Sequence, residues 1–169
     1  DPVLTRVLNA RQFALKMIAN VTYGYTSAGY SGRMPCAEIA DSIVQTGRTT
    51  LERAIDFVEQ HPLWKARVVY GDTDSMFVAV PGRSVAAAWE IGAAIAEQVT
   101  ASNPPPVKLK LEKVYTSSVL VSKKRYAGFM LEAPAQIAPE LDVKGLEAVR
   151  RDACIGMQKA MQDVLHMVF

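Results

Sequence analysis

The hexapeptide Tyr70-Gly71-Asp72-Thr73-Asp74-Ser75 contains the side chains best suited to chemistry. Its two carboxylates stand two residues apart, between two strongly apolar runs. Like charges at this spacing are unfavourable unless something positive binds between them. Hard divalent cations such as Mg²⁺ accept carboxylate oxygens and fill their remaining positions with water or substrate phosphates. A solvated Asx turn is the alternative, and we would prefer it for an isolated Asp-x-Asp pair. The complete hexapeptide between apolar strands favours a cation site.

A basic stripe lies further along the chain, between Val107 and Tyr126. It contains one acid, Glu112, and six cations: Lys108, Lys110, Lys113, Lys123, Lys124 and Arg125. Such a local excess of positive charge suits a polyanion, because each neutralised phosphate releases condensed counterions. An ordinary solvated face is the alternative interpretation.

Composition limits the class of protein. The chain has 169 residues, of which 50% are hydrophobic and 21% charged, as in a single domain or one lobe of a larger protein. Disordered and fibrous chains are excluded. No apolar run reaches the roughly 20 residues of a membrane span, and the start Asp1-Pro2-Val3 predicts no secretory signal. Two cysteines, Cys36 and Cys154, are too few for a disulfide framework, so we expect core thiols.

Apolar periodicity and helix-breaking residues predict the elements that position these side chains. A hairpin should carry the two acids at its turn. The order of elements predicts an α+β fold, with an antiparallel sheet and helices packed on one face. Helices are expected at 7–24, 36–60, 85–102 and 154–168, and strands at 66–70, 75–80, around 109–111, within 119–131 and near 141–145.

Four motifs, in one order, resemble those of family B DNA polymerases. The hexapeptide resembles the third palm motif, and Lys123-Lys124-Arg125-Tyr126 the primer-template motif. Lys16, Asn20 and Tyr23-Gly24 resemble the fingers-helix motif. Lys144-Gly145, followed by Arg150-Arg151-Asp152, is similar to the segment that leads into the thumb.

The finer resemblance is to a translesion branch of this family. It is carried by Ala19–Thr26 and by Ser31–Cys36, whereas replicative, delta-like relatives typically have Ser where this chain has Val21. The resemblance implies an antiparallel palm sheet at 34–146, a fingers remnant at 1–33 and the beginning of a thumb at 147–169. It also implies nuclear work on primer-template DNA and dNTP. Accessory polymerase subunits would bind regions outside this segment, and no membrane is involved.

The resemblance also implies roles for single residues. Asp74 would be the ligand shared by two Mg²⁺ ions, with Asp72 supporting it. Glu112 would be either a further carboxylate near the metals or a salt-bridge partner of neighbouring lysines. The remaining assignments are nucleotide binding by Lys16, Asn20 and Tyr23, and DNA binding by Thr73, Lys123, Lys124, Arg125 and Tyr126.

One departure from the family pattern matters for activity. The family takes an essential metal-binding aspartate from an upstream Asp-Phe-x-Ser-Leu-Tyr-Pro motif, and this chain has no such stretch. We therefore expect the 169 residues alone to be catalytically inert, and an exposed apolar surface could promote dimerisation. Three other functions remain open. One is the palm of a replicative, delta-like family B polymerase, and another is a non-catalytic, palm-derived nucleic-acid-binding module. The most remote is a metal-dependent nuclease that uses the same acids.

Overall fold

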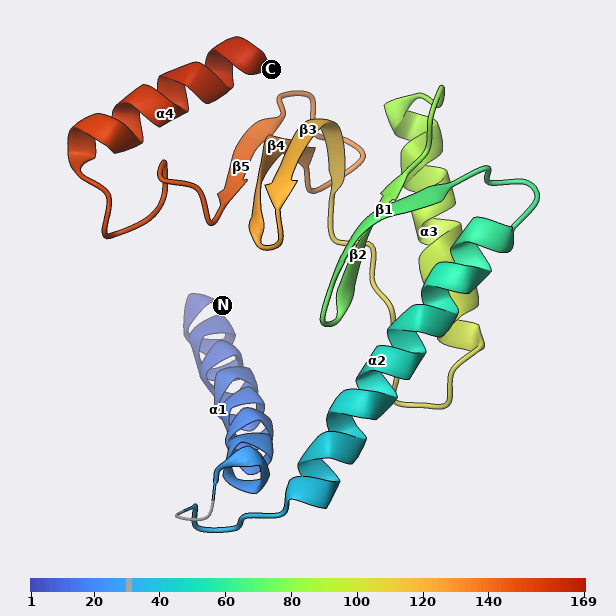
Figure 1. Cartoon of the computed structure of the whole chain (residues 1–169), viewed down its shortest axis with the longest axis vertical. Coiled ribbons are helices and arrows are strands. Elements are labelled where there is room, and N and C mark those ends of the chain that lie inside the picture. The colour runs from blue at the N-terminus through green and yellow to red at the C-terminus, as the bar shows by residue number, and fades with distance from the viewer. Residues whose placement is uncertain (30–31) are drawn as a thin grey trace. The chain divides into compact units, whose positions relative to one another are not determined.

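The computed structural model describes residues 1–29 and 32–169, so Tyr30 and Ser31 of the quoted stretches lie outside the described residues. The chain divides into two compact units, 1–52 and 53–169. Helices and antiparallel strands are both present, which confirms the α+β class (Figure 1). In the described part of the chain, every helix is too short or too polar to cross a bilayer. The elements are α1 (Pro2–Ser27), α2 (Ala37–Gln60), β1 (Arg67–Asp72), β2 (Ser75–Ala79), α3 (Val85–Ala101), β3 (Val114–Ser122), β4 (Arg125–Leu131), β5 (Glu140–Lys144) and α4 (Ile155–Val168).

The first unit contains α1 and the first two thirds of α2. Helix α1 begins five residues earlier than the periodicity predicts. The side chain of Asp1 accepts a hydrogen bond from the Val3 N–H at 2.8 Å, and Pro2 stands at the first helical position, where a missing N–H costs nothing. Helix α2 ends before His61-Pro62, as expected for a residue that precedes proline.

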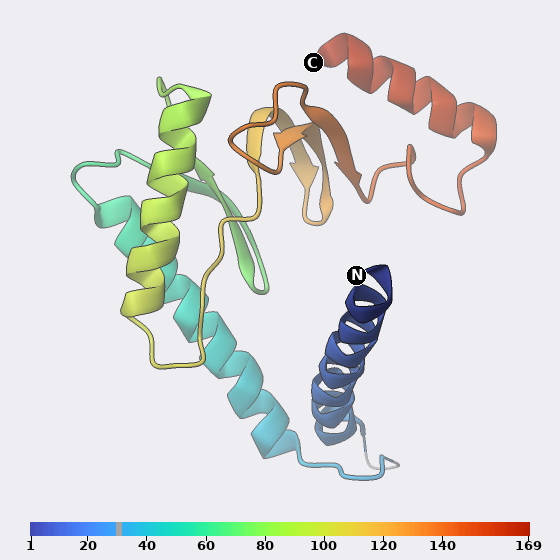
Figure 2. The same cartoon turned by 180° about the vertical axis from the view of Figure 1, so that it is seen from behind.

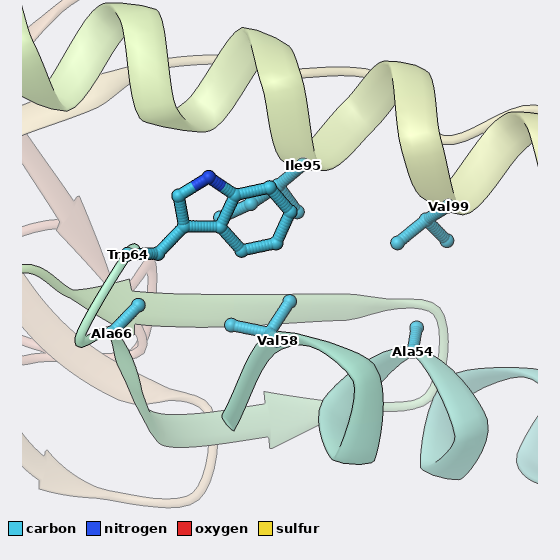
Figure 3. Packing of buried hydrophobic residues seen from close by; sticks show 6 residues of the cluster. All are labelled: Ala54, Val58, Trp64, Ala66, Ile95 and Val99. Atoms are coloured by element: carbon cyan, nitrogen blue, oxygen red, sulfur yellow. The ribbon is translucent and has the colours of Figure 1, made fainter. Parts of the chain in front are cut away.

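The first core of the second unit lies between helices and one face of the β1–β2 hairpin. The last third of α2 and α3 cover this face (Figure 1; Figure 2). Val58 is fully buried at its centre. The cluster consists of Ala54, Val58, Trp64, Ala66, Ile95 and Val99 (Figure 3). The sequence prediction of helices packed on one face is therefore right for this hairpin.

The strands form two sheets rather than the single sheet that the sequence predicts. One has the order β1-β2 and the other β3-β4-β5, all antiparallel. The expected strand around 109–111 is absent from the structure, and β3 and β4 share the region that includes 119–131. The reason is a contact with the preceding helix, because the hydroxyl of Thr100 on α3 donates to the Leu109 carbonyl at 3.3 Å and accepts from the Leu109 N–H at 3.0 Å. Helix α3 thus holds the backbone that a strand partner would need.

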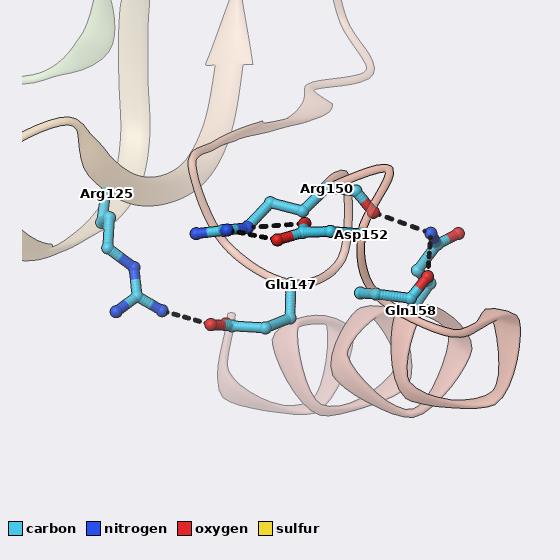
Figure 4. Close-up of polar contacts among 6 residues, drawn as sticks. Arg125, Glu147, Arg150, Asp152 and Gln158 are labelled. Carbon is cyan, nitrogen blue, oxygen red and sulfur yellow. Dashed lines mark hydrogen bonds and ion pairs between the residues drawn. The ribbon is translucent and has the colours of Figure 1, made fainter.

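A second core lies between the three-stranded sheet and α4. Ala127 at its centre is fully buried, and Leu146, Ala148 and Leu165 complete the cluster. The side-chain amide of Gln158 donates to the Arg150 and Ala153 carbonyls, at 2.9 and 3.0 Å, and so fixes the start of α4 on the preceding loop (Figure 4).

Candidate active site

The β1–β2 turn and the β3–β4 turn meet in the second unit. In each hairpin the last paired residues leave a two-residue turn: Thr73-Asp74 in the first, Lys123-Lys124 in the second. The Lys124 ammonium donates to Asp72 Oδ2 at 2.9 Å. The Lys124 backbone N–H donates to the Tyr70 hydroxyl oxygen at 2.7 Å. The third-palm-like motif and the primer-template-like motif therefore touch through two bonds made by one residue.

The two acids of the first turn have different surroundings. The Asp72 side chain is 19% exposed, and the hydroxyl of Thr73 donates to its second oxygen at 3.2 Å. The hydrogen bond from Lys124 lowers the pKa of Asp72, and partial burial opposes this only in part. Asp74 is exposed, and within the described residues its carboxylate has no hydrogen-bonded or ionic partner. The positive charge that paired acids require is thus supplied to Asp72 by the chain itself.

Backbone geometry holds both turns in an uncommon conformation. Thr73 has φ of 52° and Lys124 has φ of 62°, in the left-handed region that residues other than glycine rarely adopt. Such outliers persist only where their surroundings fix them, and they are frequent at functional sites. Around Thr73, the Asp74 N–H donates to the Asp72 carbonyl at 2.6 Å and the Ser75 hydroxyl donates to the same oxygen at 3.1 Å.

An aromatic cluster joins the two hairpins behind the turns. The ring of Phe77 lies 5.0 Å from that of Tyr126, 5.2 Å from that of Tyr115 and 5.7 Å from that of Tyr70. These centroid separations are in the range at which aromatic pairs attract beyond simple burial. Burial raises the pKa of Tyr126. Tyr126, predicted to bind DNA, contacts other aromatic rings instead of standing free.

A buried carboxylate that the sequence analysis missed lies on β5. Asp142 is 6% exposed, accepts hydrogen bonds from the Tyr115 hydroxyl at 2.6 Å and from Lys113 at 2.9 Å, and forms an ion pair with Lys144 at 3.1 Å. Burial would raise the pKa of Asp142, but the three donors outweigh it and lower the pKa to about 2. Burial and the Asp142 bond both raise the pKa of Tyr115. The spacing of Asp142 and Lys144 places both side chains on the same face of a short strand, and this spacing is the sequence pattern that indicates the pair.

The primer-template-like motif uses its three cations differently. Lys124 pairs with Asp72, and Arg125 pairs with Glu147 at 2.6 Å (Figure 4). Glu147 is a second residue that the sequence analysis missed. Lys123 is exposed, and within the described residues it has no ionic partner. Only one of these three cations is therefore unpaired.

Other predicted site residues are not brought to these turns. Glu112 is exposed and lines a surface pocket with Lys110, Lys113 and Glu132. Its predicted salt bridge to a neighbouring lysine is wrong for Lys113, which pairs with the more buried Asp142. Among the described residues, no three acidic, histidine or cysteine side chains lie close enough to hold a metal together.

The fingers-like residues and the cysteines are more exposed than a core position requires. Lys16, Asn20 and Tyr23 are all exposed on α1, in the first unit. The prediction of core thiols is wrong for Cys154, which is exposed, while Cys36 is half-buried. Cys154 stands at the N-cap of α4, outside the helix, and so does not share its buried face.

The donor set at the first turn fits a hard divalent cation. Two carboxylates within three residues provide oxygen donors, and Asp74 presents its carboxylate to solvent. Mg²⁺ is commonly bound by one or two carboxylates, with water and substrate phosphates as the other ligands. The ion pair with the Lys124 ammonium shows that the Asp72 carboxylate accommodates a positive charge.

The family follows from comparison with known proteins. The family model of DNA polymerase family B matches residues 1–169. The chain is 57% identical over 169 residues to the DNA polymerase zeta catalytic subunit of Saccharomyces cerevisiae, covering 100% of this chain and 11% of the relative. The zeta catalytic subunit of Homo sapiens is 56% identical over 169 residues, with 100% and 5% covered. The DNA polymerase delta catalytic subunit of Plasmodium falciparum is 41% identical over 169 residues, with 95% and 15% covered.

The chain thus spans from 5% to 15% of the length of these relatives. Both zeta subunits are more similar to it than the delta subunit is, in agreement with the finer resemblance around Val21. The match runs through all four motifs, from the fingers-like helix to the segment before α4. The chain belongs to DNA polymerase family B.

Proposed function

We propose that this chain is the palm-centred part of a zeta-type, translesion DNA-directed DNA polymerase. The reaction is transfer of a nucleotide from dNTP to the 3′-hydroxyl of a primer. The observation that supports it most directly is the Asp72–Asp74 turn, held against a basic hairpin. Identity to zeta subunits over the whole chain supports the subtype. Work in the nucleus and accessory subunits bound through other regions belong to the same proposal.

The domain assignment is part of the proposal. Residues 1–33 are assigned to the fingers, 34–146 to the palm and 147–169 to the start of the thumb. In this assignment the palm contains both hairpins, and the aromatic cluster of Phe77, Tyr115 and Tyr126 is its internal brace. Helix α4, packed on the three-stranded sheet, belongs to the thumb.

Asp74 and Asp72 are proposed to hold Mg²⁺. Asp74 offers an exposed carboxylate, and Asp72 is kept in its ionised form because Lys124 lowers its pKa. The cation supplies Lewis acidity that activates the primer hydroxyl and stabilises the charge of the leaving pyrophosphate. The chain supplies position: the two-residue turn fixes both carboxylates relative to β1 and β2.

The remaining residues are proposed to bind the substrates. Lys16 would contact the triphosphate as a flexible point charge, with Asn20 and Tyr23 beside the nascent base pair. Glu112 stays a proposed additional metal ligand. Thr73, Lys123, Lys124, Arg125 and Tyr126 form the proposed DNA contact, which must address phosphates and sugars because a polymerase moves over any sequence.

A chimaera tests this function. The matching segment of the yeast zeta catalytic subunit, 57% identical, is replaced by this chain, and primer extension is measured with Mg²⁺ and dNTP. We expect extension, and a loss of at least roughly a hundredfold in kcat for Asp74→Asn, as for removal of other transition-state stabilising groups. The matched control is Asp163→Asn, the same change at an exposed acid on α4. Equal rates for the two variants would overturn the assignment.

The 169 residues alone are proposed to be inert. Within the described residues the paired acids have no third carboxylate beside them. Primer extension by the purified chain that disappears in Asp74→Ala would refute this.

A chimaera that binds primer-template DNA but never extends it would instead favour the non-catalytic nucleic-acid-binding module. The observation in favour of this module is the Lys124–Asp72 ion pair, since Lys124 neutralises Asp72 without a metal.

A further inference from the structure

Both oxygens of the Asp72 carboxylate are already occupied by donors from the chain. Oδ2 accepts from the Lys124 ammonium at 2.9 Å, and Oδ1 accepts from the Thr73 hydroxyl at 3.2 Å. Asp74, two residues away, is exposed and lacks such a donor within the described residues. The two acids of one motif therefore differ: one holds an internal cation, and the other is open to a cation from solution.

The backbone of Lys124 is fixed independently of its ammonium. Its N–H is held by Tyr70, and its carbonyl oxygen lies against Gly145, where a Cβ atom would clash with it. The side chain, in contrast, is 66% exposed. Exposed ion pairs contribute little to stability. The ammonium can therefore leave Asp72 without separating the two hairpins.

An ammonium in contact with a carboxylate oxygen weakens the binding of a divalent cation to the same carboxylate, because the two positive charges repel each other at this distance. We propose that Lys124 and a divalent cation compete for Asp72, so that cation binding releases the Lys124 ammonium to a phosphate of bound DNA. This rests on the proposed cation site and goes beyond it. Lys124 becomes a positioning residue that couples the metal site to the DNA surface.

The coupling has a thermodynamic consequence. If cation binding frees a positive charge for DNA, then DNA that takes this charge must improve cation binding by the same factor. Lys123 offers a matched comparison, because it carries the same charge in the same turn but does not touch Asp72. General electrostatic effects should be alike for the two lysines, whereas the competition belongs to Lys124 alone.

Binding of Mn²⁺ to the 169-residue chain, followed by electron paramagnetic resonance, tests the competition without any catalytic readout. Lys124→Gln should bind Mn²⁺ roughly fivefold more tightly than the parent, the scale of an exposed ion pair. The Mn²⁺ affinity of Lys123→Gln should differ from that of the parent by less than about twofold. Lys124→Arg should have the Mn²⁺ affinity of the parent, because arginine keeps the positive charge. Equal gains for the two glutamine variants, or no gain in either, would overturn the proposal.

The coupling to DNA is tested with a short duplex at constant ionic strength. Mn²⁺ should raise the affinity for the duplex in the parent and in Lys123→Gln. In Lys124→Gln, in which no ammonium is left to release, this gain in affinity should be smaller. Thermal melting followed by circular dichroism first checks that the three proteins are equally well folded. An identical Mn²⁺ effect in all three would overturn the coupling.

The outcome is separable from that of the proposed function. A chimaera that fails to extend primers, together with tighter Mn²⁺ binding by Lys124→Gln, leaves the competition standing and removes the polymerase assignment. A chimaera that extends primers, together with unchanged Mn²⁺ binding in Lys124→Gln, retains the polymerase and removes the competition.

Discussion

The carbonyl oxygen of Lys124 fills the space that a side chain on Gly145 would need. Gly145 follows β5 directly and has φ of 67°, so glycine is required there both for its conformation and for the close approach. This contact holds the β3–β4 turn against the end of β5. The position of the turn that touches Asp72 therefore depends on a residue outside both hairpins.

Gly145→Ala should lower the free energy of unfolding by roughly 2–4 kcal/mol, because a left-handed alanine and a clash with backbone both cost energy. Urea unfolding measures it. Gly156→Ala is the control, since a Cβ at Gly156 meets no atom within 4 Å, and this helical position should gain about 0.5–1 kcal/mol. Similar values for the two variants would contradict the role of the Lys124 contact.

Asp142→Asn should be destabilising although the shape of the side chain is kept. The substitution removes the negative charge that two lysines and Tyr115 share in a buried place. Breaking one partner of a buried charge network typically costs about 3–5 kcal/mol, and partial exposure of Lys144 reduces this to roughly 2–3. Thermal melting followed by circular dichroism is the measurement, and a variant as stable as the parent would show that the network contributes nothing.

Stability should also depend on pH through Asp142. Its pKa is about 2 in the folded chain and near 4 when unfolded, so the folded state binds fewer protons. The contribution is complete above about pH 4 and is lost as the pH falls toward 2, a change of about 2 kcal/mol. Unfolding by urea at several pH values in this window should show a steeper loss for the parent than for Asp142→Asn. Parallel curves would contradict the assignment.

Lys123 should account for a measurable part of the salt dependence of DNA binding. It is exposed and unpaired within the described residues, so a phosphate contact would release about 0.9 counterion. Lys123→Ala should reduce the slope of log K against log salt by about one, measured by fluorescence anisotropy with a duplex. Lys159→Ala, an exposed lysine on α4, should leave the slope unchanged. A slope unaltered in Lys123→Ala would exclude Lys123 from the contact.

Much of the local structure could be predicted from the sequence. The sequence predicts the acids at a hairpin turn, and the structure has Asp74 in the turn and Asp72 at the end of β1, because the flanking apolar runs and the turn residues are signals within a few positions. Helix α3 was predicted to within one residue, since its start is capped by Ser84, whose hydroxyl accepts from the Ala87 N–H at 3.2 Å. Local patterns sufficed where local contacts decide the structure.

Contacts between distant segments could not be predicted in this way. Lys124 and Asp72 are 52 residues apart, and nothing in either motif indicates that one neutralises the other. The alternation of Leu109 and Leu111 with lysines is a strand pattern, yet Thr100 holds the backbone along α3. The buried Asp142 was overlooked because its partners Lys113 and Tyr115 come from another strand region.

The two sheets have a further consequence for motion. Within the described residues no hydrogen bond between backbone groups joins β1–β2 to β3–β4–β5. The sheets are joined by side-chain contacts, above all among the rings around Phe77, and by the bond from the Lys124 N–H to the Tyr70 hydroxyl, so a small rotation between the sheets would break neither ladder. Amide hydrogen exchange should therefore reveal two separately opening bodies, with the acid turn on one and the basic turn on the other.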